Sequence, residues 1–181
     1  MKALVFFADG FEEIEGFGTV DILLRGGVEV CMVSVTDSVQ VFGAHDICTV
    51  TDAFLEEIDV IKSCDAFILP GGGPGSIALN EHEGLRSVLV EQCDAGKLIA
   101  AICAAPRVLG SLGLLEGRRA TCYPGIEPEL TGANIVAEAV VVDGNIITAR
   151  GPAAVFDFGL AILRYLQGDS IADQVAKDLL L

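Results

Sequence analysis

The sequence predicts an α/β sandwich with a mostly parallel central sheet. Three observations lead to this fold class: short runs of apolar residues, helical patterns between them, and a hairpin signal near the C-terminal end. Unbroken apolar runs are typical of strands that helices cover on both faces, whereas apolar and polar residues alternate along a strand with one exposed face. The 181 residues fit one domain, residues 1–181, and 52% hydrophobic residues exclude an intrinsically disordered chain.

Four apolar runs are expected to form the parallel strands: residues 3–8, 28–35, 66–69 and 98–102. Asp143 and Gly144 lie between the apolar residues 140–142 and residues 145–149. A dipeptide of this kind favours a two-residue β-hairpin. We therefore expect a parallel sheet with one antiparallel hairpin.

The first two helices are expected between these strands. Residues 12–25 carry apolar residues near one stripe, and Gly26-Gly27 ends the pattern; the stripe is Ile14, Phe17, Val20 and Leu24. A second helix is predicted to begin at Asn80, with Glu83 completing a capping box, and to end at Gly96.

Three further helices follow in the second half of the chain. One is expected directly after Cys103, with Pro106 in its first turn. Another runs from Pro152 to Leu166, with Phe156, Leu160 and Leu163 at helical spacing, and a short amphipathic tail covers residues 171–181. The alternation of strands and helices predicts a parallel sheet, and such sheets bind ligands at the carboxyl ends of their strands. We therefore expect the functional residues directly after the strands.

Charge and hydropathy narrow the choice of partners. Eleven basic and 26 acidic residues give a net charge of −15, which disfavours nucleic acids and anionic membrane surfaces. We expect no membrane span and no secretion signal, so a cytoplasmic location and six free thiols are predicted. The spacing of cysteines and histidines does not favour a zinc site, and no cofactor is expected.

Cys103 is the strongest candidate for a chemically active residue. It follows the predicted strand 98–102 and has alanine two positions to either side, as a tight nucleophile elbow requires. Its position before a helix predicts a lowered thiol pKa. The alternative is a small cysteine buried in the core, which we favour for each of the other five.

Two further segments end at the same predicted edge. Residues 70–75 form a glycine-rich turn whose N–H groups could hold an oxyanion, although an ordinary strand-to-helix turn is the better explanation of this segment taken alone. Glu12, Glu13 and Glu15 fall in a first helical turn, where acids complement the helix dipole, and one of them could instead face the thiol. His45 and His82 are interpreted as surface residues.

Taken together, four segments resemble the DJ-1/ThiJ/PfpI superfamily, and the chain end at residues 171–175 resembles its DJ-1-type branch. The segments are residues 10–15, 69–72, 100–106 and 150–152. The resemblance implies a flavodoxin-like three-layer α/β sandwich and a homodimer. It also implies that Cys103 is the reactive cysteine and Glu15 its protonated partner, with Gly72 and Ala104 as oxyanion donors.

One position departs from the family pattern. Many DJ-1-type members carry a histidine before a proline, whereas this chain has Tyr123-Pro124. A phenol is a poor base at neutral pH, so Tyr123 is expected to donate a hydrogen bond at the site.

Two classes of function follow from the resemblance. As an enzyme, Cys103 would attack a small reactive aldehyde and form a hemithioacetal, in a glyoxalase III or deglycase reaction or a weak hydrolysis. As an oxidation sensor or chaperone in the stress response, Cys103 would become a sulfinic acid stabilised by Glu15. The same residues serve both, so the sequence leaves the choice open.

Overall fold

A computed structural model describes residues 1–57 and 61–181 of the chain. Its centre is a seven-stranded sheet in the order β10-β11-β7-β6-β1-β2-β5. Every neighbouring pair is parallel except β10 and β11, which form the predicted hairpin. The strands are β1 (Lys2–Phe7), β2 (Glu29–Ser34), β5 (Ala53–Phe54), β6 (Ala66–Leu69), β7 (Leu98–Ile102), β10 (Val140–Asp143) and β11 (Ile146–Ala149).

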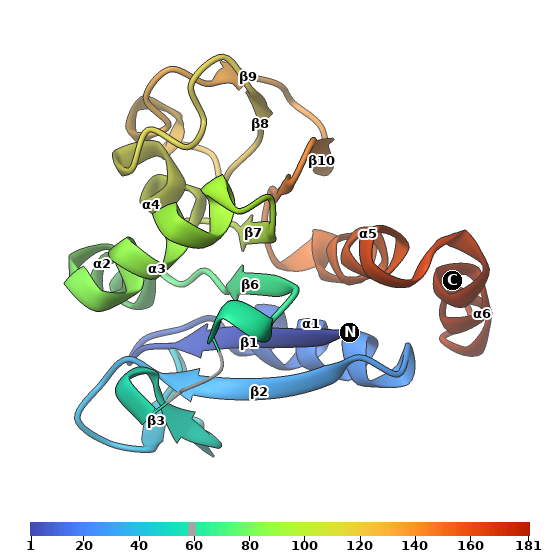
Figure 1. The fold of residues 1–181 in the computed structure, drawn as a ribbon, viewed down its shortest axis with the longest axis horizontal. Coiled ribbons are helices and arrows are strands. Elements are labelled where there is room, and N and C mark those ends of the chain that lie inside the picture. The colour runs from blue at the N-terminus through green and yellow to red at the C-terminus, as the bar shows by residue number, and fades with distance from the viewer. Residues whose placement is uncertain (58–60) are drawn as a thin grey trace.

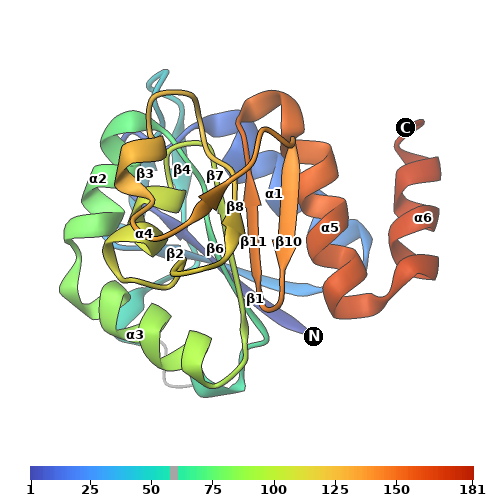
Figure 2. The same cartoon turned by 90° about the horizontal axis from the view of Figure 1, so that it is seen from above.

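Helices cover both faces of this sheet, as Figures 1 and 2 show. One layer contains α1 (Glu13–Arg25) and α5 (Val155–Gln167), with α6 (Asp169–Asp178) packed outside α5. The other layer contains α2 (Gly73–Glu81), α3 (Glu83–Asp94) and α4 (Pro106–Ser111). The predicted three-layer α/β sandwich is confirmed.

The remaining elements are short and lie at the periphery. Two small sheets are formed by β3 (Gln40–Phe42) with β4 (Cys48–Val50), and by β8 (Arg119–Ala120) with β9 (Asn134–Ile135). Four 3-10 helices complete the fold: η1 (Leu55–Glu57), η2 (Ile61–Ser63), η3 (Glu127–Glu129) and η4 (Pro152–Ala154).

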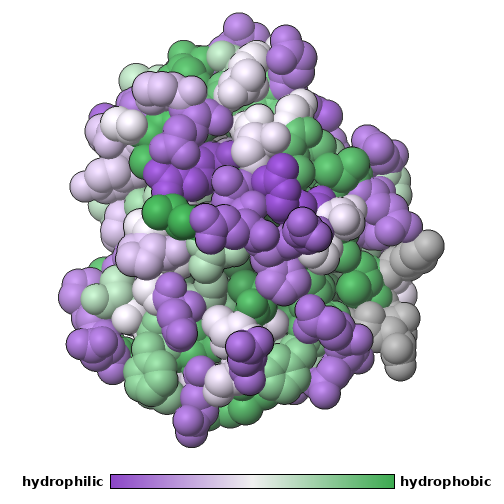
Figure 3. Space-filling model, turned by 90° about the vertical axis from the view of Figure 1, so that its left-hand side faces the viewer, coloured by the Kyte–Doolittle hydropathy of each residue, from purple (hydrophilic) through white to green (hydrophobic). Residues whose placement is uncertain are grey.

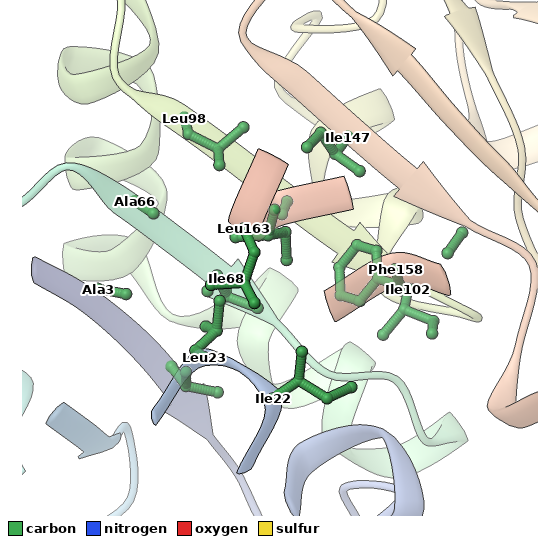
Figure 4. Packing of buried hydrophobic residues seen from close by; sticks show 14 of the residues in the cluster. Ala3, Ile22, Leu23, Ala66, Ile68, Leu98, Ile102, Ile147, Phe158 and Leu163 are labelled. Carbon is green, nitrogen blue, oxygen red and sulfur yellow. The ribbon is translucent and has the colours of Figure 1, made fainter. Parts of the chain in front are cut away.

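Apolar side chains between the sheet and the α1–α5 layer form one half of the core (Figure 4). Ile22 and Leu23 of α1 and Phe158 and Leu163 of α5 pack with Ile68 of β6, and all five are fully buried. Burial of each such side chain contributes roughly 1.5–3 kcal/mol. This packing fixes β1, β6 and β7 side by side, and the candidate site lies at their carboxyl ends.

The inner face of α1 differs from the predicted stripe. Ile14 and Leu24 are 57% and 55% exposed, while Gly16 and Thr19 face inward with the buried Ile22 and Leu23. A Cβ atom on Gly16 would lie 2.8 Å from the ring of Phe7. Small residues therefore let α1 approach the sheet closely. Of the predicted stripe, Phe17 and Val20 are partly buried against this core, whereas Ile14 and Leu24 lie on the outer face.

Two other helix predictions need correction. The segment around residue 80 forms two helices separated at His82, whose Nδ1 accepts from the Leu85 N–H at 3.1 Å and caps α3. Asn80 instead lies inside α2, so it caps no helix. In α5, Phe156 is exposed and Phe158 is the core residue.

The surface on the left side of Figure 1 mixes polar and apolar side chains, with a hydrophilic band across its middle (Figure 3). Within the described residues, no helix combines the length and apolar character needed to cross a bilayer.

Candidate active site

The three segments that follow β1, β6 and β7 meet at one edge of the sheet. The Glu12 N–H donates to the Gly71 carbonyl at 3.0 Å, and the Gly75 N–H donates to the Gly10 carbonyl at 3.3 Å. A Cβ atom on Gly72, which has φ +98°, would lie 2.2 Å from the Gly10 carbonyl oxygen. This close approach requires glycine and brings the loop after β6 against the start of α1.

Cys103 lies in a tight turn directly after β7. Its φ is +64°, a conformation that costs a non-glycine residue roughly 1–3 kcal/mol. Two backbone hydrogen bonds hold the turn: the Cys103 N–H donates to the Ala149 carbonyl at 2.8 Å, and the Cys103 carbonyl accepts from the Tyr123 N–H at 2.7 Å. The nucleophile elbow predicted from the flanking alanines is therefore present in the backbone.

The sulfur of Cys103 faces two backbone donors. The backbone N–H groups of Gly72 and Ala104 lie near its sulfur and favour its charged form, and Cys103 is 8% exposed. These are the residues to which the family resemblance assigned the oxyanion. The structure thus brings the predicted donors together at the predicted nucleophile, where they can stabilise negative charge on sulfur or on an oxygen bonded next to it.

Glu15 is fully buried beside this turn. Its Oε2 accepts from the Gly71 N–H at 2.8 Å, and its carboxyl interacts with the Cys103 thiol. Its Oε1 is buried and has no hydrogen-bond partner among the described residues. Burial raises the pKa of Glu15 from 4.5 to about 7, while the interactions with Cys103 and Gly71 act in the opposite direction.

The expected lowering of the Cys103 pKa is wrong. Burial, and then the charge of Glu15, raise the pKa of the thiol to about 12, although Gly72 and Ala104 oppose the shift. The helix contributes little because α4 begins only at Pro106 and has six residues. The pair therefore carries a single negative charge between about pH 7 and about pH 12, and the two groups can share the remaining proton.

The backbone hydrogen bond from the Tyr123 N–H to the Cys103 carbonyl holds Tyr123 beside the nucleophile. The Tyr123 side chain is half-exposed. Its ring contacts Gly151, where an added Cβ would lie 3.4 Å from Cδ2. Tyr123 also lines an open cavity of about 510 Å³ that Cys103 itself does not line. The cavity is bounded by Arg150, Asp157 and small residues, among them Pro124, Ala137, Ala139, Pro152, Ala153 and Ala154.

The sequence analysis missed a link between Glu13 and His45. The buried Glu13 carboxylate accepts from the His45 backbone N–H at 2.6 Å and lies 2.7 Å from Nδ1 of its exposed ring. Burial raises the pKa of Glu13, but the bonds from His45 outweigh it and leave that pKa below 4.5. The bond to Glu13 raises the pKa of His45. No local pattern connects residues 32 positions apart, so the sequence offered no signal.

Glu12, Glu13 and His45 also form the one group in the described residues whose ligand atoms, all within 4.8 Å, could hold a metal ion. Their atoms already bond within the protein, because Glu12 accepts from the Glu15 N–H and Glu13 accepts from His45. The ordinary interpretation is a helix cap and an ion pair.

None of the six cysteines, all of which are described, forms a disulfide. Burial raises the pKa of Cys31, Cys64, Cys93 and Cys122. The two predicted oxyanion donors and the buried carboxyl surround Cys103 alone among the cysteines, all of which are described.

Comparisons with known proteins agree with this geometry. Residues 1–165 match the family model described as the DJ-1/PfpI family. Drosophila melanogaster protein dj-1beta is 38% identical over 99% of this chain and 96% of its own length. The chain is 39% identical to Arabidopsis thaliana protein DJ-1 homolog A but spans only 46% of that protein.

Two relatives have names that state an activity. A Caenorhabditis elegans protein named glutathione-independent glyoxalase is 35% identical, over 94% of this chain and 90% of its own length. A Pyrococcus abyssi protein named deglycase is 35% identical, over 86% of this chain and 93% of its own length.

Solved structures extend the match to the fold. Drosophila melanogaster DJ-1beta has a TM-score of 0.94 at 38% identity, over 99% of this chain and 97% of that chain. Oxidized Toxoplasma gondii DJ-1 has a TM-score of 0.93 at 34% identity, with coverage of 99% and 97%. With one family model across most of its length and full-length relatives in sequence and structure, the chain belongs to the DJ-1/PfpI family.

Proposed function

We propose that this protein acts on small reactive aldehydes through Cys103, as a glyoxalase or deglycase of the DJ-1 type. One observation carries the proposal: a buried carboxyl and two backbone N–H donors converge on a cysteine held in a nucleophile elbow. The names of the two relatives described above support the choice of substrate class.

In the reactive form of the pair the shared proton lies on Glu15 and Cys103 is a thiolate, and the first step would be addition of this sulfur to the aldehyde carbon of methylglyoxal. The carbonyl π pair moves to oxygen, the N–H groups of Gly72 and Ala104 stabilise the oxyanion, and Glu15 donates the proton that completes a hemithioacetal. Between about pH 7 and about pH 12 the pair holds one proton, so the form with this proton on Glu15 supplies both the nucleophile and the acid.

The second step would be an internal oxidation and reduction. Glu15, now a carboxylate, removes the proton from the former aldehyde carbon, and the resulting enediol is reprotonated at the neighbouring carbon. The first carbon reaches the oxidation level of a thioester and the second becomes an alcohol, so no external oxidant is needed. Water then cleaves the thioester, which releases lactate and restores the thiol.

Tyr123 changes this chemistry relative to a family member with histidine at that position. We assign it the role of a hydrogen-bond donor at the site, which leaves proton transfer to Glu15. Its position next to the Cys103 carbonyl and beside the cavity supports this role.

The second candidate is an oxidation sensor or chaperone in the stress response. Here peroxide would convert the Cys103 thiolate to a sulfinic acid, with the Glu15 carboxyl donating a hydrogen bond to a sulfinate oxygen. The similarity to oxidized Toxoplasma gondii DJ-1 favours keeping this candidate. Free thiols throughout the chain fit a reducing compartment such as the cytoplasm.

We also propose that the protein is a homodimer. Exposed apolar side chains gather on the outer face of α1 and on the β3–β4 hairpin, namely Ile14, Leu24, Phe42, Ile47 and Val50. The bond between His45 and Glu13 holds this hairpin against the start of α1. A second copy of the chain is the partner that we expect on this surface.

Lactate formation from methylglyoxal tests the enzymatic proposal. Pure wild-type protein should produce lactate, Cys103→Ser should abolish production, and Cys64→Ser should retain it as a matched control. Wild-type protein without lactate formation would reject the enzyme. Mass spectrometry after mild peroxide then tests the sensor, which requires the first sulfinic acid on Cys103 and not on Cys31 or Cys122.

A further inference from the structure

Arg150 has no role in the function proposed above. It follows β11 directly and lines the cavity of about 510 Å³ that Tyr123 borders. It also borders a smaller cavity of about 170 Å³ on its other side. The larger cavity is far roomier than methylglyoxal requires and falls in the size range of pockets that hold drug-sized ligands.

The bonding of Arg150 sets it apart from the other arginines. The chain has seven arginines, and the side chains of six of them bond to a carboxylate, an amide, a hydroxyl or a carbonyl. The Arg150 guanidinium has no hydrogen bond or ion pair with any residue in the described parts of the chain, 1–57 and 61–181. The Arg150 side chain is exposed, and its unpaired charge beside a mainly apolar cavity is available to an anionic ligand.

The backbone links this cavity to the predicted nucleophile at two points. Ala149, the residue before Arg150, accepts the hydrogen bond of the Cys103 N–H, and Tyr123 donates its N–H to the Cys103 carbonyl. The Tyr123 ring then lies over Gly151, the residue after Arg150. A molecule that reacts at Cys103 could therefore extend past Tyr123 toward Arg150.

We propose that Arg150 and this cavity bind a carboxylate that is joined to the reactive carbonyl by a short apolar segment. This inference rests on the proposed function, and it identifies the substrate class as an aldehyde that carries a carboxylate. A carboxylate fits better than a phosphate, because the cavity offers one guanidinium and no other cationic side chain among its lining residues. The carboxylate of Asp157 in the same cavity further disfavours a doubly charged group.

Alkylation of Cys103 by two N-substituted iodoacetamides, N-(3-carboxypropyl)iodoacetamide and N-butyliodoacetamide, tests this subsite without any aldehyde chemistry. The two reagents have the same reactive carbon and a short apolar chain, but only the first ends in a carboxylate. The rate of each is measured at Cys103 by peptide mass spectrometry, in wild type, Arg150→Met, Arg150→Lys and Asp157→Asn. Arg164→Met, which removes an equal charge from the far end of α5, is the matched control.

We expect Arg150→Met to lower the ratio of the carboxypropyl reagent's rate to the butyl reagent's rate about five- to tenfold, as loss of a nearby charge predicts. Arg150→Lys should keep most of the ratio, Asp157→Asn should raise it, and Arg164→Met should leave it within about twofold. A ratio that Arg150→Met leaves unchanged, or that Arg164→Met lowers equally, would overturn the subsite. Wild type that forms no lactate would reject the proposed function instead, and the alkylation ratio would still decide the carboxylate subsite.

Discussion

Replacing Glu15 with Gln should remove most of a pH-dependent loss of stability that the wild-type protein shows. In the folded protein, burial raises the pKa of Glu15 to about 7, whereas the unfolded chain has the ordinary value of 4.5. Below pH 4.5 both states hold the proton, and the group has no effect on the free energy of unfolding. Between the two values the unfolded chain has lost its proton while the folded protein keeps it, so stability falls as pH rises.

The magnitude follows from the size of the shift. At 1.36 kcal/mol for each pKa unit, a shift from 4.5 to about 7 corresponds to about 3 kcal/mol in total, of which about 2.5 kcal/mol falls between about pH 5 and about pH 8. Gln has nearly the shape of Glu and does not titrate, so the variant should lack this contribution. Cys103 is coupled to Glu15, but its thiol titrates above this pH interval, and the titrating groups away from the pair are shared by the two proteins and cancel in the difference.

The assay is urea unfolding of wild type and Glu15→Gln at about pH 5 and about pH 8, at one fixed protein concentration. The wild type should lose about 2.5 kcal/mol relative to the variant over this interval. Stability curves that run parallel to within about 0.5 kcal/mol would show that Glu15 is ionised in the folded protein, and the argument for a shared proton would fail.

Three further changes test the geometry of the site and its surroundings. Gly71→Ala places a Cβ atom 2.5 Å from Glu15 Oε2 and 2.6 Å from Cys103 Cβ, so it should lower lactate formation strongly and destabilise the fold by about 1–3 kcal/mol. Gly73→Ala, where the added atom meets open space, is the control, and equal effects in both variants would contradict the contact. Tyr123→His should increase methylglyoxal turnover because imidazole is a better base than phenol. Tyr123→Phe should mainly weaken the stabilisation of oxidised Cys103. If neither substitution changes the turnover or the rate of Cys103 oxidation, the Tyr123 hydroxyl lies in solvent and has no role at the site. Light scattering at micromolar concentration should give the mass of a dimer for wild type and the mass of a monomer for Ile14→Glu, which places a charge on the proposed interface. Ile171→Glu on α6 is the control and should remain a dimer. A monomeric wild type would contradict the proposed interface.

Unbroken apolar runs made the parallel sheet predictable. Residues 66–69 and 98–102 match β6 and β7 residue for residue, because strands buried on both faces cannot carry a polar residue without a partner. The hairpin was predictable for another reason, since Asp143-Gly144 fits only a tight turn between strands.

Contacts between distant residues were beyond the reach of these patterns. The inner face of α1 depends on how closely Gly16 can approach Phe7, and the His45–Glu13 bond depends on where the β3–β4 hairpin folds back. The sequence placed Cys103 at a nucleophile elbow, and the resemblance added Glu15, Gly72 and Ala104 to it. The pKa of the thiol could not be predicted, because it depends on burial and on a carboxyl 88 positions away in the sequence.

The shared proton between Cys103 and Glu15 is tested most directly by the pH dependence of Cys103 alkylation with iodoacetamide. In the wild type, the rate should rise through a step near pH 7, where the pair loses its first proton and sulfur carries part of the negative charge. Glu15→Leu removes the second group of the pair, so the step near pH 7 should disappear and the rate should rise only above the ordinary pKa of a thiol. Profiles of wild type and Glu15→Leu that coincide over the whole range would contradict the account.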